Sequence, residues 1–121
     1  MNNFTRKILK EEIEFSYTNN GKIEILISPH YGAGWSTWNE NYKINIALDK
    51  RIINYYKKYG NEVPSSSLKE FLESIGYKDV FCGGWKNIII KTIQKGEKFR
   101  IDEYDGWESL ITYEKDEIYE L

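Results

Sequence analysis

Hydrophobic and polar residues alternate near the start of the chain, which is typical of β-strands with one buried face. The alternation covers residues 13–17 and 23–27, and Asn19-Asn20-Gly21 lies between these two segments. Because asparagine and glycine tolerate positive φ, this triplet is typical of a tight hairpin turn. The pattern therefore predicts an antiparallel pair of strands.

Two segments in the middle of the chain have the periodicity of amphipathic helices. The first is predicted to begin with Asp49 as its N-cap and to end at Gly60. The second is predicted to begin at Ser67, which would form a capping box with Glu70, and to end at Gly76. The apolar stripe of this second helix consists of Leu68, Phe71, Leu72 and Ile75.

The strand pattern returns in the last third of the chain. Three further strands are predicted, over residues 85–94, 98–104 and 107–113. Lys95-Gly96 is the predicted turn between the first two, and Asp105-Gly106, between the last two, is typical of a type I′ hairpin. The sequence thus predicts one α+β domain over residues 1–121, with an antiparallel sheet of about five strands and two central helices packed on one face.

The composition of the 121-residue chain is that of a globular protein, with 40% hydrophobic and 30% charged residues, but 16% of the residues are aromatic. Tyrosine and tryptophan concentrate at interfaces because they offer large, rigid surfaces at low entropic cost. The chain lacks an apolar run of about 18 residues and the apolar core of a signal peptide, so we expect a cytoplasmic protein without membrane association. The single cysteine, Cys82, excludes an internal disulfide and agrees with a reducing compartment.

The net charge of −2 conceals an uneven distribution of charge. The last 21 residues contain eight acidic residues and one lysine, whereas the first 100 residues have five more basic than acidic residues. An acidic end repels nucleic acid, and we therefore expect no direct nucleic-acid binding.

Candidate catalytic groups are few. His30 and Cys82 each lie beside a glycine-rich aromatic segment and are the candidates for a base and a nucleophile, but their spacing does not show that they meet. A cysteine beside an aromatic residue is more often part of the core. The sequence has no spacing typical of a metal site, and Thr37 stands where a dinucleotide fingerprint needs its third glycine. We expect no cofactor and favour a non-enzymatic protein.

Three segments, PHYGAGW, CGGW and EYDGW, place a tryptophan beside glycine. In one interpretation the glycines relieve crowding around buried tryptophans. In the other, the rings line a pocket in which Arg51 and Arg100 meet phosphate and uncharged side chains form hydrogen bonds. The candidate ligand-binding residues are His30, Tyr31, Trp35, Ser36, Thr37, Trp38, Asn39, Arg51, Trp85, Arg100 and Tyr104.

Four motifs together resemble a group of short proteins encoded by phages and prophages. The motifs are HYGAGWSTWN, IALDKRII, GYKDVFCGGWKNIII and FRIDEYDGWES, and the resemblance spans residues 23–111. It carries no established chemistry. It implies a context, because small phage proteins without enzyme motifs often act against host defences, by occupying a host protein or by sequestering a signalling nucleotide.

Two functions are expected from these observations. The first is a phage counter-defence protein that sequesters a small nucleotide-like immune signal in an aromatic pocket, in the host cytoplasm. The alternative is an anti-CRISPR-type inhibitor that binds a host defence protein through its acidic C-terminal hairpin, where Asp102, Asp105 and Glu108 would imitate nucleic acid. The aromatic content is also compatible with a homodimer, in which a shared interface would bury exposed rings.

Overall fold

Four β-strands and three α-helices follow one another in the computed structural model, which describes residues 13–42 and 44–113. In chain order they are β1 (Lys22–Ile27), α2 (Asn45–Leu48), α3 (Lys50–Tyr59), α4 (Ser65–Ser74), β2 (Ile89–Gln94), β3 (Lys98–Tyr104) and β4 (Trp107–Tyr113). Two short 3-10 helices, η1 (Ser36–Trp38) and η2 (Trp85–Asn87), lie in the connecting segments. The predicted α+β class is confirmed.

The long helices were predicted well from the sequence. The side chain of Asp49 accepts a hydrogen bond from the backbone N–H of Arg51 and caps α3, which ends at Gly60 with a φ of 72°. The apolar stripe of α4 is also confirmed. The predicted capping box at Ser67 is wrong, because α4 begins two residues earlier, at Ser65, directly after Pro64. Ser67 therefore lies inside the first turn, where its side chain caps nothing.

The predicted single sheet of five strands is wrong. Among the strands of the described residues, β1 forms a ladder with β2 and β3 forms one with β4, so that they make two antiparallel two-stranded sheets. The segment before β1 forms isolated bridges from Phe15 to Asp49 and from Tyr17 to Ile23. It does not continue along β1, because the carbonyl of Glu14 accepts a hydrogen bond from the N–H of Lys50 and directs this segment towards α3.

The two turns of the last third are where the sequence placed them, but only one joins paired strands. The turn at Asp105-Gly106 has φ angles of 50° and 89° and joins β3 to β4, as a type I′ hairpin requires. The turn at Gly96 instead connects β2 of one sheet to β3 of the other. The strand predicted from residue 85 begins at Ile89, since residues 85–87 form η2.

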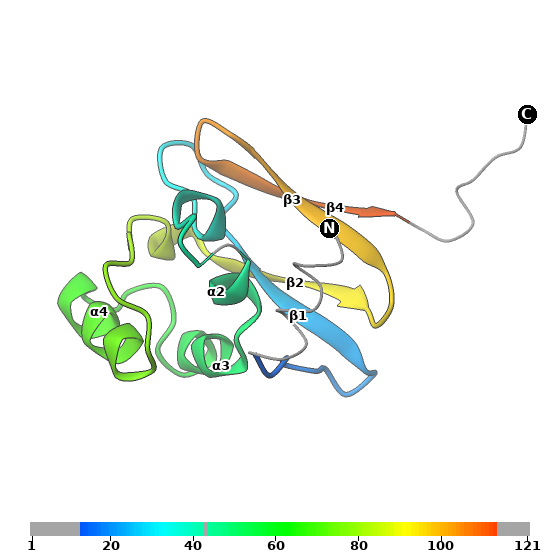
Figure 1. Cartoon of the computed structure of the whole chain (residues 1–121), viewed down its shortest axis with the longest axis horizontal. Helices are drawn as coiled ribbons and strands as arrows, with labels where there is room; N and C mark the ends of the chain where they lie inside the picture. Colours follow the sequence, from blue (N-terminus) through cyan, green and yellow to red (C-terminus); the bar gives the residue numbers. More distant parts are fainter. Residues whose placement is uncertain (1–12, 43, 114–121) are drawn as a thin grey trace, which may run out of the picture.

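Strand β1 is buried on both faces, and all of its residues except Lys22 are buried. Ile23, Ile25 and Ile27 pack in one cluster with residues of β3–β4 such as Phe99. Leu26 points the other way, into a cluster with the helices α3 and α4. Figure 1 shows the same arrangement, with α3 and α4 on one side of the β1–β2 pair and the β3–β4 hairpin on the other. The hairpin and the helices are therefore held together through β1.

Candidate functional site

The three glycine–tryptophan segments meet around the loop of residues 28–39. A Cβ on Gly84 would lie 2.6 Å from the carbonyl oxygen of Gly34, and one on Gly106 would lie 2.6 Å from the backbone nitrogen of Ala33. The N–H of Gly32 also donates to the carbonyl of Asp105 at 2.8 Å. Backbone therefore packs directly on backbone at both contacts, and only glycine fits there.

A buried carboxylate, that of Glu108, holds this loop. Its side chain is 1% exposed and accepts hydrogen bonds from the backbone N–H groups of Ser28, Trp35 and Thr37 at 2.9, 2.9 and 3.0 Å. It also accepts one from the Thr37 hydroxyl at 2.6 Å. Four donors from the loop thus replace the hydration that a buried carboxylate loses. The carboxylate in turn gives each of these donors a hydrogen-bond acceptor.

Glu108 was misread from the sequence as one of the acidic groups on the hairpin surface. The strand alternation held the signal that could have identified it, because Glu108 and the partly buried Leu110 share the inward face of β4 while Trp107 and Ser109 face outward. The acidic surface predicted for nucleic-acid mimicry therefore lacks Glu108. Four of its predicted carboxylates, those of Glu114, Asp116, Glu117 and Glu120, lie outside the described residues.

Trp35 and Trp85, two of the candidate ligand-binding residues, lie in the core. Their ring centres are 5.4 Å apart, and neither side chain is appreciably exposed. Each indole N–H is satisfied inside the protein, by the carbonyl of Ile46 for Trp35 and by that of Gly60 for Trp85, both at 2.9 Å. These rings have no open face on which a ligand could stack.

The polar candidates of the loop are also occupied by contacts within the protein. Ser36 is buried, and Thr37 binds Glu108. The amide of Asn39 donates to the carbonyls of Trp35 and Phe81 and accepts a hydrogen bond from the N–H of Phe81. These side chains fix the shape of the loop.

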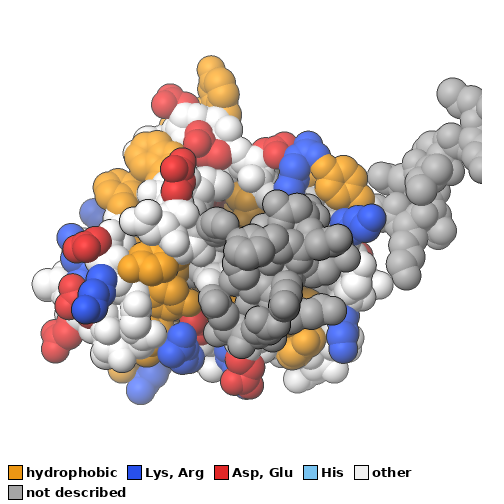
Figure 2. Space-filling model, in the orientation of Figure 1, with side chains coloured by type: hydrophobic (Ala, Val, Ile, Leu, Met, Phe, Trp, Pro, Cys, Tyr) orange, Lys and Arg blue, Asp and Glu red, His pale blue; other side chains and the backbone are white. Residues whose placement is uncertain are grey.

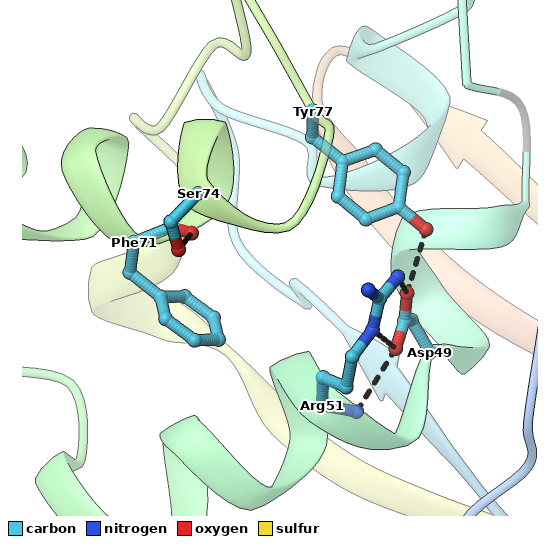
Figure 3. Close-up of polar contacts among 5 residues, drawn as sticks. All are labelled: Asp49, Arg51, Phe71, Ser74 and Tyr77. Atoms are coloured by element: carbon cyan, nitrogen blue, oxygen red, sulfur yellow. Dashed lines mark hydrogen bonds and ion pairs between the residues drawn. The ribbon is translucent and has the colours of Figure 1, made fainter.

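Arg51 lies in a different place, at the start of α3. Its guanidinium contacts the carboxylate of Asp49, with 2.7 Å between Nη2 and Oδ2, and the hydroxyl of Tyr77 donates to the same Oδ2 at 2.7 Å. Figure 3 shows the three side chains converging, with Tyr77 reaching Asp49 from the segment that follows α4. This cluster fastens the segment after α4 to the N-terminus of α3.

The contacts within the cluster shift the pKa values of its members. Burial alone would raise the pKa of Asp49, but the hydrogen bonds from Arg51 and Tyr77 outweigh it and hold the pKa below its ordinary value of 3.8. Burial, followed by the hydrogen bond to the Asp49 carboxylate, raises the pKa of Tyr77 above its ordinary range. The carboxylate is thus charged and the phenol neutral at physiological pH.

The lowered pKa of Asp49 predicts a pH-dependent stability. Because the folded state binds this proton less tightly than the unfolded state, the stabilisation is complete above pH 3.8 and is lost as the pH falls through the folded pKa. Asp49→Asn retains an N-cap acceptor but no charge, and we expect it to cost about 1–3 kcal/mol at pH 7. Urea unfolding at pH 7, 5 and 3 should show the difference between the two proteins shrinking at pH 3. A constant difference would contradict this assignment.

Four rings stand at the surface where the loop meets the β3–β4 turn, and we call them the aromatic tip: His30, Tyr31, Tyr104 and Trp107. The ring of Trp107 lies 4.9 Å from that of Tyr31 and is stacked at 6.4 Å on that of His30. Tyr104 is 76% exposed. The aromatic tip lines an open hollow of about 480 Å³, bordered by Tyr31, Asp102, Glu103, Tyr104, Trp107 and Ser109.

Trp107 was not among the candidate residues, although its motif was recognised. The type I′ turn pairs Tyr104 directly with Trp107, so both side chains project from the same face of the hairpin. Combining that register with the choice of Tyr104 as a candidate would have identified Trp107 as its neighbour.

The charged residues that line this hollow are Asp102 and Glu103, both acidic. Arg100, a candidate for phosphate binding, donates to Asp102 through Nε at 2.6 Å, and this hydrogen bond lowers the pKa of Asp102. Its guanidinium also lies 5.2 Å from the ring centre of Tyr113. Figure 2 shows hydrophobic and acidic side chains side by side over the end of the molecule that carries the β3–β4 turn. Because Arg100 is paired with Asp102, the carboxylate of Glu103 is the lining charge without a cationic partner among the described residues.

The two candidate catalytic residues have separate surroundings. Cys82 is buried, its thiol contacts the carbonyl of Val80, and burial raises the pKa of this thiol, which disfavours the reactive thiolate. His30 is exposed in the aromatic tip, with Nδ1 2.9 Å from the carbonyl of Tyr31. Over residues 13–42 and 44–113, no three His, Cys, Asp or Glu side chains are grouped as metal ligands would be.

Comparison of the chain with models of protein families, with curated proteins and with solved structures finds no match. Among the helices of the described residues, none has the length and apolar character needed to cross a membrane.

Proposed function

We propose that this chain is a non-enzymatic binding protein that uses the aromatic tip to engage a basic surface of a partner protein. The observation that carries the proposal is the hollow in which Tyr31, Tyr104 and Trp107 stand beside Asp102 and Glu103. Aromatic faces and carboxylates together attract lysine and arginine side chains, through cation–π contacts and charge-assisted hydrogen bonds.

The base of the aromatic tip supports this function. The loop is fixed by the four hydrogen bonds to Glu108, and the hairpin turn packs through Gly106 on the loop backbone. Rings on a rigid base lose little conformational freedom when a partner binds, which leaves more of the contact energy for affinity. Tyrosine and tryptophan dominate binding energy at many protein interfaces for the same reason.

The resemblance to small phage proteins gives the proposed partner a context. In that setting the partner is a host defence protein with a basic surface, and Asp102, Glu103 and Asp105 take the place of phosphates. This proposal keeps the inhibitor function that was expected for the acidic hairpin. It adds the aromatic rings as anchors and leaves out Glu108, which is buried.

Sequestration of a nucleotide-like signal is the competing proposal. Exposed rings such as Tyr31 and Trp107 could stack a base. The carboxylate of Glu103 opposes a phosphate, however, while Arg100 is paired with Asp102 and Arg51 with Asp49. These contacts favour the protein-binding proposal.

A labelled nona-arginine peptide tests the proposal by fluorescence anisotropy. We expect Trp107→Ala to weaken peptide binding about tenfold or more, because it removes the central ring of the aromatic tip. The control is Tyr59→Ala, which removes an exposed ring of α3 and should leave the affinity unchanged. Circular dichroism checks that both variants are folded.

A matched pair of charge variants separates the effect of the hollow on peptide binding from the effect of the protein's overall charge. Asp102→Asn and Glu73→Gln each remove one exposed carboxylate, but only Asp102 borders the hollow. We expect Asp102→Asn alone to weaken binding. Equal effects of the two variants, or full affinity in Trp107→Ala, would argue against the proposal.

A further inference from the structure

Trp38 and Phe81 form a second pair of exposed rings, made of residues that do not belong to the aromatic tip. Trp38 is 38% and Phe81 45% exposed, and their ring centres are 5.6 Å apart with planes tilted by 38°. Large aromatic side chains that remain at the surface in contact with one another often mark a binding site. The function proposed above makes no use of this pair.

Each ring lies so close to a glycine that a side chain at the glycine position would collide with it. A Cβ on Gly34 would lie 2.7 Å from Cδ1 of Trp38, and a Cβ on Gly83 would lie 2.5 Å from Cζ of Phe81. The buried side chain of Asn39 fixes the backbone of Phe81, accepting from its N–H at 2.7 Å and donating to its carbonyl at 3.0 Å. The pair is therefore positioned by the fold, although its rings stay open to solvent.

Beside the pair lies a hollow of about 290 Å³ whose lining has an acidic character. Its charged lining residues are Glu40 and Asp79. The hydroxyl of Tyr42, which also borders the hollow, already exchanges two hydrogen bonds with the backbone of Lys78, and Asn39 is occupied as described. The two carboxylates are thus the charged acceptors that the hollow offers to a ligand, beside the side-chain amide of Asn41.

We propose that Trp38, Phe81, Glu40 and Asp79 form a binding site for the guanidinium group of an arginine side chain on a partner protein. A guanidinium is planar and weakly hydrated, so it stacks on aromatic faces while its edge donates to a carboxylate in a bidentate manner. A quaternary ammonium would use the rings but has no hydrogen to donate to the carboxylates. Rings and acceptors together therefore favour arginine over a quaternary ammonium, and the planar guanidinium stacks on a ring better than the compact, strongly hydrated ammonium of lysine does.

The site is tested with acetyl-arginine amide as the probe and acetyl-citrulline amide, its neutral analogue, as the control. The indole N–H signal of Trp38 in a ¹⁵N-labelled protein reports binding directly. We expect a saturable shift of this signal with the arginine probe and at least a fivefold smaller shift with citrulline at the same concentration. Equal shifts, or none with arginine, would overturn the proposal.

Variants make the test specific. Glu40→Gln with Asp79→Asn removes both carboxylates, and asparagine tolerates the positive φ of 58° at position 79. We expect this double variant to weaken binding of the arginine probe at least fivefold, whereas Glu62→Gln with Glu70→Gln, an equal change of charge at a different hollow, leaves it unchanged. Equal binding by the two double variants would refute the site.

Trp107→Ala distinguishes this inference from the proposed function. The variant disrupts the aromatic tip and should leave the shift of the Trp38 signal intact. If the arginine probe moves only the Trp107 signal of the wild-type protein, the second site is refuted while the function of the aromatic tip stands.

Discussion

Replacing Glu108 with alanine is expected to lower the free energy of unfolding by on the order of 3–5 kcal/mol, because two buried and two partly buried donors lose their acceptor at once. For a chain of this size such a loss lowers the melting temperature by about 10–20 °C. Thermal unfolding followed by circular dichroism measures it. Glu73→Ala, which removes an exposed glutamate of α4, should change the stability by less than about 0.5 kcal/mol.

Glu108→Gln is a more informative variant than Glu108→Ala. Its amide keeps one oxygen, which can serve Trp35 and Thr37, but the amide nitrogen then faces the N–H of Ser28. We expect a smaller cost than for alanine, about 1–3 kcal/mol, and faster hydrogen exchange at the amide of Ser28 than at the other two. A Glu108→Ala protein that unfolds at the wild-type temperature would contradict the role assigned to this carboxylate.

Gly84→Ala has the second largest expected effect. The backbone at Gly84 has φ −78° and ψ −11°, which alanine adopts freely, so the cost arises only from contact. The new methyl group would lie 2.6 Å from the carbonyl oxygen of Gly34 and 3.2 Å from that of Ala33, and the loop would have to move away. We expect a loss of about 3 kcal/mol, measured by urea unfolding.

Gly96→Ala is the matched control, because at this position the methyl group has space but the backbone conformation is unfavourable for alanine. Gly96 has a φ of 93°, which alanine resists, but no atom would lie within 4 Å of its Cβ. Its expected cost is about 1–2 kcal/mol, from the backbone alone. If Gly96→Ala proves the more damaging of the two, close packing of the three segments is not what requires glycine at position 84.

The sequence predicted those parts of the fold that depend on neighbouring residues. The cap at Asp49, the stop at Gly60 and the Asp105-Gly106 turn each follow from side chains within a few positions of one another. The pairing of strands that are distant in the sequence does not follow from neighbouring residues. That β1 would pair with β2, more than sixty residues away, depends on burial of β1 by helices on one side and the β3–β4 hairpin on the other.

The candidate site could likewise be predicted from the sequence only in part. Sequence patterns located the three glycine–tryptophan segments, but they did not show which of the aromatic rings are buried. Trp35 and Trp85 are core residues around which glycine allows close packing, whereas Tyr31 and Tyr104 stand at the surface. Which ring is buried depends on contacts such as those of Glu108 with the loop, and no local pattern in the loop itself encodes them.

The four indole N–H signals provide the most direct test of the aromatic tip as the binding site. The indoles of Trp35 and Trp85 are buried and hydrogen-bonded, and those of Trp38 and Trp107 are partly exposed. The measurement is a ¹⁵N–¹H spectrum of the wild-type protein titrated with nona-arginine and, separately, with cyclic di-GMP. We predict that the peptide moves the Trp107 signal, that Trp35 and Trp85 stay unchanged, and that the dinucleotide moves none of the four. A dinucleotide that shifts Trp107, or a peptide that leaves it unchanged, would contradict the account.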